Sequence, residues 1–275
     1  MGRDLRSYAR WQFRRVPGWF TRINAEVFST LLTDQINRDL TGGVVEIGVH
    51  HGRSFLLLSL AAQEHERALA IDVFEEQHLN LDMSGKGDLQ RFQRNLQKYG
   101  NPERVDVLAA SSLDITADQI TAHVGPVRFF SIDGGHSLDV TLNDLNLAAA
   151  TIAPHGVIAL DDFTSPGWPE VAVAFIQWYR GGEAEFAPFA ITRGKIYVCR
   201  RGWEKGYQAA LSANQYLALN KKKTTELLGN KMDVFTGVAG GPMTWLRLSL
   251  KMRTPRIWRI LKLMKSLAKS KLRHG

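Results

Sequence analysis

The sequence contains a single cysteine, Cys199, so it cannot form an internal disulfide. No apolar run approaches the ~20 residues that a membrane-spanning helix requires, and the arginine-rich N-terminus lacks the apolar segment of a secretory signal. These absences favour a reducing compartment, and we expect a cytoplasmic protein. At 44% hydrophobic and 23% charged residues, the 275-residue chain has an ordinary globular composition, which excludes disordered, collagen-like and disulfide-stapled classes.

Acidic residues are missing from the last part of the chain. Residues 243–275 contain ten Lys and Arg but no Asp or Glu, and residues 1–22 contain six Arg and one Asp. The net charge of +8 therefore describes two basic ends, and the body between them is mildly acidic. A nucleic-acid enzyme more often carries its basic residues around its cleft, so we do not expect a nucleic-acid partner.

Between the ends, short apolar runs alternate with helical patterns. A helix is predicted over 23–40 and a buried strand over 44–47, and the alternation continues to two closing strands over 185–191 and 195–200. Such alternation predicts an α/β fold, with a mostly parallel sheet covered by helices on both faces. The pattern of residues 202–242 indicates some helix, and the rest of their secondary structure is ambiguous.

The first predicted strand leads into Glu46-Ile47-Gly48-Val49-His50-His51-Gly52. Ligands of open α/β sheets bind at the carboxyl ends of the strands, where a dinucleotide fold would place G-x-G-x-x-G. Glu46 stands in the place of the first glycine of that pattern, and its carboxylate would repel a pyrophosphate. It suits a ligand with an amino group and a positive charge, as in S-adenosylmethionine. The alternative is a plain turn at Gly48 and Gly52 beside a surface acid.

Two further strand ends extend this candidate cofactor site. Asp72 closes the second predicted strand, where a carboxylate can accept both ribose hydroxyls. Ser111 follows the third strand and would lie beside the adenine. The alternative for Ser111 is an ordinary polar exit from a strand.

The fourth and fifth predicted strands end in acids. Asp133 is followed by two glycines and His136, and Asp161 and Asp162 follow the next strand. Neighbouring strands would bring the three carboxylates together, where they repel unless a cation lies among them. Oxygen ligands without a thiolate favour Mg²⁺, with Mn²⁺ or Ca²⁺ as alternatives, and His136 has the pKa of a general base. The alternatives are an ordinary turn and a helix N-cap.

Together these residues resemble the class I S-adenosylmethionine-dependent methyltransferases. Ile132-Asp133-Gly134-Gly135-His136 and Gly156-Val157-Ile158-Ala159-Leu160-Asp161-Asp162-Phe163 are similar to one branch, methyltransferase domain family 24. That branch includes the macrocin and mycinamicin sugar O-methyltransferases and the cephalosporin-biosynthesis methyltransferases. The resemblance covers roughly residues 40–200.

The resemblance implies a Rossmann-like, seven-stranded sheet, a divalent metal that is usually Mg²⁺, and methyl transfer to a hydroxyl, often on a sugar. By that resemblance Asp133, Asp161 and Asp162 match the metal ligands and His136 matches the base. Some members have Glu where Asp161 stands. The acceptor is then a small molecule or a glycan, and the elements that select it are expected in 1–40, 75–90 and 163–242.

The basic tail has its own pattern. Between residues 255 and 273, apolar side chains recur at helical spacing opposite Lys and Arg, as in an amphipathic helix at an anionic membrane surface. This predicts peripheral contact with the inner face of the membrane. A helix docked on the body or on a second subunit, a disordered tail and a nucleic-acid contact are the alternatives, and a homo-oligomer stays open.

The expected organisation therefore has four parts. These are a basic, aromatic helical extension over 1–40, a methyltransferase domain over 41–201, an ambiguous helical segment over 202–242 and a basic tail over 243–275. Two other functions compete with methyl transfer. One is a nicotinamide oxidoreductase, against which Glu46 argues. The other is a degenerate methyltransferase fold that serves as a membrane or nucleic-acid adaptor, against which the intact acids and His136 argue.

Overall fold

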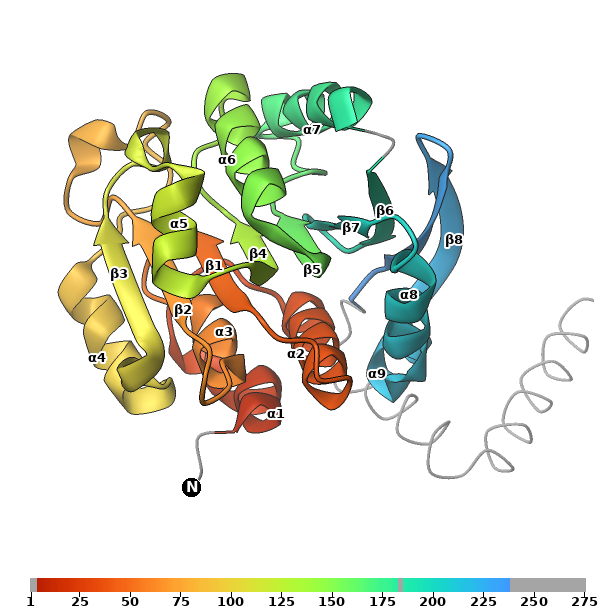
Figure 1. The fold of residues 1–275 in the computed structure, drawn as a ribbon, viewed down its shortest axis with the longest axis horizontal. Helices are drawn as coiled ribbons and strands as arrows, with labels where there is room; N and C mark the ends of the chain where they lie inside the picture. The colour runs from red at the N-terminus through yellow and green to blue at the C-terminus, as the bar shows by residue number, and fades with distance from the viewer. Residues whose placement is uncertain (1–3, 183–184, 238–275) are drawn as a thin grey trace, which may run out of the picture. The chain divides into compact units, whose positions relative to one another are not determined.

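The computed structural model describes residues 4–182 and 185–237, which belong to one compact unit (Figure 1). The amphipathic helix predicted over 255–273 lies outside the described residues. None of the described helices combines the length and hydropathy that crossing a bilayer requires.

The strands of the described part form one nine-stranded sheet in the order β3-β2-β1-β4-β5-β7-β6-β9-β8. Strands β1 to β5 run parallel to one another, whereas β7 is antiparallel to both β5 and β6. The strands are β1 (Gly43–Ile47), β2 (Ala68–Asp72), β3 (Val105–Ala109), β4 (Val127–Ile132), β5 (Ile152–Leu160), β6 (Phe186–Ile191), β7 (Ile196–Arg200), β8 (Lys221–Leu227) and β9 (Asn230–Phe235). This order confirms the predicted Rossmann-like α/β fold and places the predicted site strands side by side.

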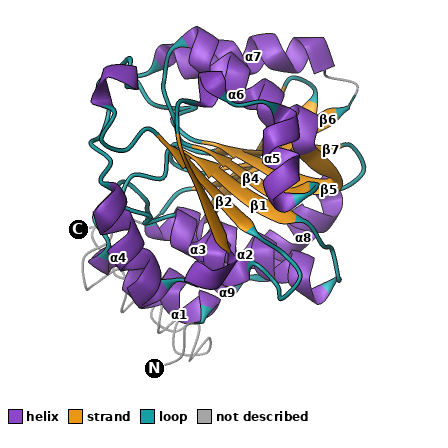
Figure 2. Cartoon of the chain, turned by 60° about the vertical axis from the view of Figure 1, so that its left-hand side comes forward, coloured by secondary structure: helices purple, strands orange, loops and turns teal. Residues whose placement is uncertain are grey.

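Helices cover both faces of the sheet (Figure 2). Helices α5 (Ala117–Val124), α6 (Leu138–Thr151) and α7 (Pro169–Gly182) pack on one face. The other face is covered by α1 (Leu5–Ser7), α2 (Arg22–Asn37), α3 (Phe55–Ala61), α4 (Leu89–Tyr99), α8 (Glu204–Ala213) and α9 (Gln215–Asn220). Because both faces are covered, β1 and β4 are buried along their whole length, as expected for central parallel strands.

The strand count differs from the seven that the resemblance implies. Strands β8 and β9 form an antiparallel hairpin within the segment whose structure the sequence left ambiguous, and β9 pairs parallel with β6. The hairpin therefore extends the sheet beyond β6.

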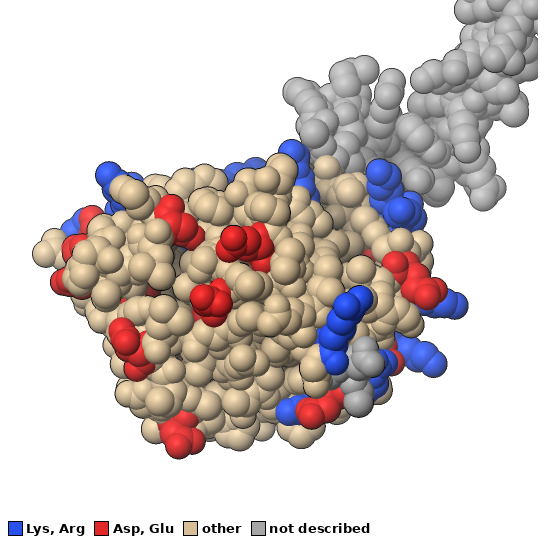
Figure 3. Space-filling model, turned by 90° about the horizontal axis from the view of Figure 1, so that it is seen from above, with Lys and Arg blue, Asp and Glu red and all other residues tan. Residues whose placement is uncertain are grey.

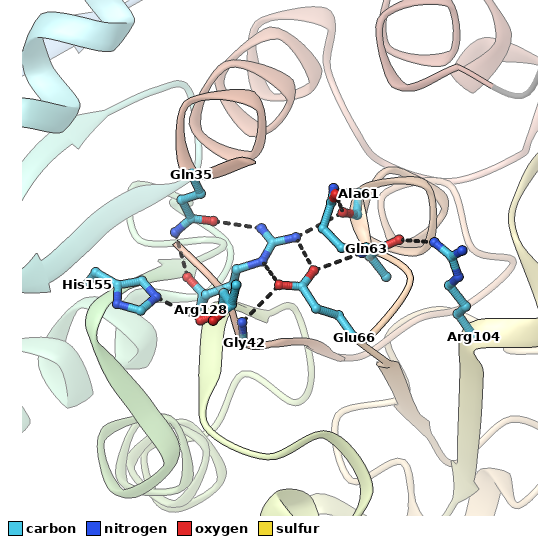
Figure 4. A network of polar contacts seen from close by, with 10 residues as sticks. Gln35, Gly42, Ala61, Gln63, Glu66, Arg104, Arg128 and His155 are labelled. Atoms are coloured by element: carbon cyan, nitrogen blue, oxygen red, sulfur yellow. Dashed lines mark hydrogen bonds and ion pairs between the residues drawn. The ribbon is translucent and has the colours of Figure 1, made fainter. Parts of the chain in front are cut away.

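A buried ion pair fastens the amino ends of the strands, at the edge away from the predicted site (Figure 4). Arg128 on β4 is fully buried and binds both carboxylate oxygens of Glu66, at 3.0 and 2.9 Å. Its other bonds go to the Gln35 side chain on α2 and to the carbonyl of Ala61 on α3. The guanidinium thus has partners from three directions and joins α2, α3 and β4.

Candidate active site

A cavity of about 960 Å³ lies at the carboxyl ends of the parallel strands. Its wall includes the ends of β1, β2, β4 and β5, residues 18–21 of the N-terminal segment, and the loop between β2 and α4. The volume is near the upper end for small-molecule sites and leaves room for two ligands side by side. Figure 3 looks down on this face: acidic side chains are spread across its middle, and most lysines and arginines lie toward its margin.

Most of the residues predicted from the sequence line this cavity. They are Gly48, Asp72, Ser111, Asp133, His136, Asp161 and Asp162. Glu46 and Gly52 do not line it. Gly52 has a φ of +89°, and a Cβ there would lie 2.9 Å from the Phe92 ring, so this glycine lets α4 pack closely.

Gly48 brings two strand ends into direct backbone contact. Its φ is +82°, and a Cβ at this position would lie 1.8 Å from the carbonyl oxygen of Asp133. The Asp133 amide donates to the carbonyl of Ile47 at 2.9 Å. Gly48 therefore leaves a bare backbone cradle beside the acids.

Asp72 is held rigidly at the end of β2. Its two carboxylate oxygens accept backbone N–H bonds from His50 and Phe74, both at 2.6 Å. Burial raises its pKa, and these bonds oppose the rise. The bonds fix the carboxylate on the cavity wall while leaving lone pairs for hydroxyl donors.

Glu46 lies beneath the cavity. It is fully buried on β1, and its Oε1 accepts a 2.8 Å bond from the Ser131 hydroxyl on β4. Burial raises its pKa to about 7, against the opposing effect of Lys195 and two serine hydroxyls. A substantial fraction of Glu46 is therefore protonated at neutral pH.

The three predicted metal ligands converge. Asp133, Asp161 and Asp162 each offer a carboxylate oxygen within 4.8 Å of the others. A cation that was not predicted lies beside them: Lys195, which is fully buried, places its Nζ 3.2 Å from Asp133 Oδ2 and 2.7 Å from Asp161 Oδ2. Burial and Asp161 raise the pKa of Asp133 well above its usual value, and Lys195 opposes them.

His136 lies between two carboxylates. Its Nδ1 is 2.6 Å from Asp82 Oδ2 and its Nε2 is 2.9 Å from Asp162 Oδ2, while the ring stacks on Trp168 at 4.3 Å. Burial lowers the pKa of His136, but the bonds to Asp162 and Asp82 outweigh it, so the pKa is raised. The imidazole is thus oriented from its Nδ1 side, with Nε2 facing the acids.

Three parts of the site carry no sequence motif. Asp82 comes from the loop between β2 and α4, within the range 75–90 where acceptor-selecting elements were expected. Trp19 and Phe20 of the N-terminal segment also line the cavity. Lys195 follows Gly194 at the start of a predicted strand, and a charged residue directly before a buried strand is the one signal that could have marked it.

The donor chemistry of the triad fits a divalent cation such as Mg²⁺, because all three ligands are hard carboxylate oxygens. Each carboxylate also has a second oxygen beyond the one that contacts Lys195 or His136. Counting Asp82 as well, four carboxylates face one lysine and one histidine. The surplus of negative charge favours the binding of a further cation.

Comparison with known proteins identifies a methyltransferase domain in this part of the chain. A family model described as a methyltransferase domain matches residues 45–163. No curated protein matches the chain.

The fold is shared with solved structures, of which NovP and Rv0187 are two. The O-methyltransferase NovP is 18% identical with a TM-score of 0.56 over 66% of this chain and 83% of its own. Cofactor-bound Rv0187 from MTB is 19% identical with a TM-score of 0.50 over 72% of this chain and 88% of its own. From the family match and the sheet order, we conclude that residues 45–163 form a methyltransferase domain of the class I fold and that this chain is a methyltransferase.

Proposed function

We propose that the chain transfers a methyl group from S-adenosylmethionine to a hydroxyl of a sugar, glycan or glycosylated metabolite, with Mg²⁺ held by Asp133, Asp161 and Asp162. One observation carries the proposal: a single cavity has a glycine cradle and a fixed Asp72 on one side and the acid–histidine cluster on the other. This arrangement suits a donor and a hydroxyl acceptor held next to each other.

The donor half uses residues of the first three strands. Asp72 would accept the ribose hydroxyls, and Ser111 would lie beside the adenine. The bare backbone at Gly48 would lie against the methionine end, where no side chain intervenes. Glu46 would act from beneath the cavity floor, where a positively charged sulfonium nearby would favour its ionised form.

The acceptor half uses the triad and His136. A divalent cation at the triad would make a nearby hydroxyl more acidic. When Asp162 turns toward the cation, the Nε2 proton of His136 would pass to water, and Nε2 would then take the proton of the acceptor hydroxyl while Asp82 holds the Nδ1 side. The acceptor oxygen bonds to the methyl carbon, and the C–S bond breaks with its electron pair on sulfur. The main contribution of the protein is to hold oxygen, carbon and sulfur in line.

Apolar surface at the cavity supports a glycosylated acceptor. Trp19 is 75% exposed and Leu81 is 69% exposed, and both belong to the cavity wall. Exposed apolar side chains beside polar groups are typical of ligand grooves. A sugar ring presents both an apolar face and hydroxyl edges, which would meet these two kinds of surface.

The test is a transfer assay with S-adenosylmethionine and a panel of sugars, nucleotide sugars and glycosylated metabolites, with products identified by mass spectrometry. We expect one added methyl group on a hydroxyl, with loss of turnover in His136→Ala and retention in His65→Ala, which changes an exposed histidine that does not line the cavity. Transfer to nitrogen or carbon alone, or turnover unaffected by His136→Ala, would contradict the proposal.

A further inference from the structure

Lys195 is a buried cation that the transfer mechanism above does not use. It precedes β7, whose pairing of Ile196 with Leu160 of β5 places it directly beside Asp161. Its carbonyl accepts bonds from the amide and the hydroxyl of Thr192, which close the turn between β6 and β7. The backbone of Lys195 is therefore fixed by the sheet and the turn.

The ammonium of Lys195 is buried. Its side chain is 0% exposed, and its Nζ lies 6.0 Å from the ring centres of both Phe20 and Phe28. A lysine is almost never buried in this way unless it is paired. Here the pairing is with two of the three acids proposed as metal ligands, Asp133 and Asp161.

We propose that Lys195 is a permanent counter-ion of the acidic triad, which holds Asp133 and Asp161 together without metal and weakens the binding of a divalent cation by them. The inference rests on the proposed function for one point only, the use of the triad as a cation site. Lys195 acts through the acids, so it is a positioning residue.

The charge of Lys195 affects both the acids and an incoming cation. Without Lys195, the repulsion between the carboxylates would have to be relieved by protonation or by a bound cation. With Lys195 in place, an incoming divalent cation meets a positive charge within a few ångströms of two of its ligands, and this costs binding energy. The site should therefore be assembled in the absence of metal and should bind metal reversibly.

The experiment measures Mn²⁺ binding directly, by calorimetry and by the loss of the free-ion electron paramagnetic resonance signal, on the full chain. Lys195→Gln removes the charge and keeps a side chain that can hydrogen-bond the acids. We expect it to bind Mn²⁺ about tenfold more tightly or better than the wild type, because a like charge at this distance costs at least ~1.4 kcal/mol. Lys98→Met, which removes an exposed lysine, should leave the affinity unchanged.

Thermal unfolding supplies a second readout that does not depend on activity. The wild type should melt only slightly lower in EDTA than in Mg²⁺, because a weakly bound ion adds little stability, whereas Lys195→Gln should melt much lower in EDTA and recover with Mn²⁺. The comparison of the wild type in EDTA and in Mg²⁺ remains a test even if the variant does not fold.

Three results would overturn the inference: equal or weaker Mn²⁺ binding by Lys195→Gln, no Mn²⁺ binding by either protein, or a wild type that no longer folds in EDTA. Binding of S-adenosylmethionine, measured in the same samples, reports on the proposed function separately. Saturable cofactor binding together with any of these results would leave methyl transfer in place and remove the role of Lys195.

Discussion

Gly48 shows how one missing side chain shapes the site. We expect Gly48→Ala to push the loop away from Asp133, since its Cβ would lie 1.8 Å from the Asp133 carbonyl oxygen. The expected loss is about 1–3 kcal/mol of unfolding free energy together with a marked fall in S-adenosylmethionine affinity, measured by denaturation and calorimetry.

Gly125→Ala is the matched control for this substitution. Gly125 also has a positive φ, +67°, but a Cβ there meets nothing within 4 Å. It should share the backbone strain and leave cofactor affinity intact. Equal cofactor binding by Gly48→Ala and the wild type would show that the contact with Asp133 has no role in the cavity.

The buried carboxyl of Asp144 on α6 should make the stability of the protein depend on pH. It is fully buried, and burial raises its pKa to about 7, against the opposing bonds from Ser112 and Asn143. Between pH ~4, where the unfolded carboxyl ionises, and pH 7, the native state holds a proton that the unfolded chain has lost. Stability therefore falls as the pH rises through this window.

Asp144→Asn should flatten this fall, as measured by urea unfolding at pH 5 and pH 8. Part of the slope should remain, because Glu46 also has a pKa of about 7. An unchanged slope in Asp144→Asn would contradict the assignment.

At the residue scale, the sequence predicted the side chains that follow parallel strands, because such strands end at one edge of the sheet. Asp133, Asp161 and Asp162 converge for this reason. It could not predict Lys195 or Asp82, since a turn and a long loop bring them to the cavity from other parts of the chain. Nor could it show that Glu46 points beneath the cavity, because the facing of a side chain on a covered strand depends on tertiary packing.

At the scale of elements, the guanidinium of Arg128 joins α2, α3 and β4, and its charge is paired with Glu66. Glu66→Ala would leave a buried guanidinium without its carboxylate, and such losses cost about 3–5 kcal/mol. We expect this loss in chemical denaturation, with little change for the neighbouring exposed control Glu64→Ala. A loss below ~1 kcal/mol would mean that the pair is not essential to the fold.

The elements that the sequence predicted well are those with a strong apolar pattern. The predicted strand over 44–47 lies within β1, Gly43–Ile47, and the helix over 23–40 corresponds to α2, Arg22–Asn37. The β8–β9 hairpin was not predicted because β8, Lys221–Leu227, is polar and mostly exposed. Edge strands often carry lysines in this way, which avoids pairing with other chains but removes the alternation that identifies a strand.

At the scale of the whole molecule, the described unit accounts for the cavity without the basic tail. We predict that a chain ending at residue 242 keeps its melting temperature and its S-adenosylmethionine affinity. It should lose co-sedimentation with anionic vesicles if the tail makes the proposed membrane contact. Neutral vesicles are the control. Equal co-sedimentation of the full chain and the shortened chain with anionic vesicles would contradict the proposed membrane contact.

The central claim is that the cavity binds the methyl donor and that the triad acts on the acceptor. Calorimetric titration of S-adenosylmethionine into the full chain, first with Mg²⁺ and then with EDTA, tests it most directly, with a nicotinamide dinucleotide as the competing ligand. The account predicts saturable binding of S-adenosylmethionine in both conditions and none of the dinucleotide. No binding of S-adenosylmethionine by folded protein in either condition would contradict it.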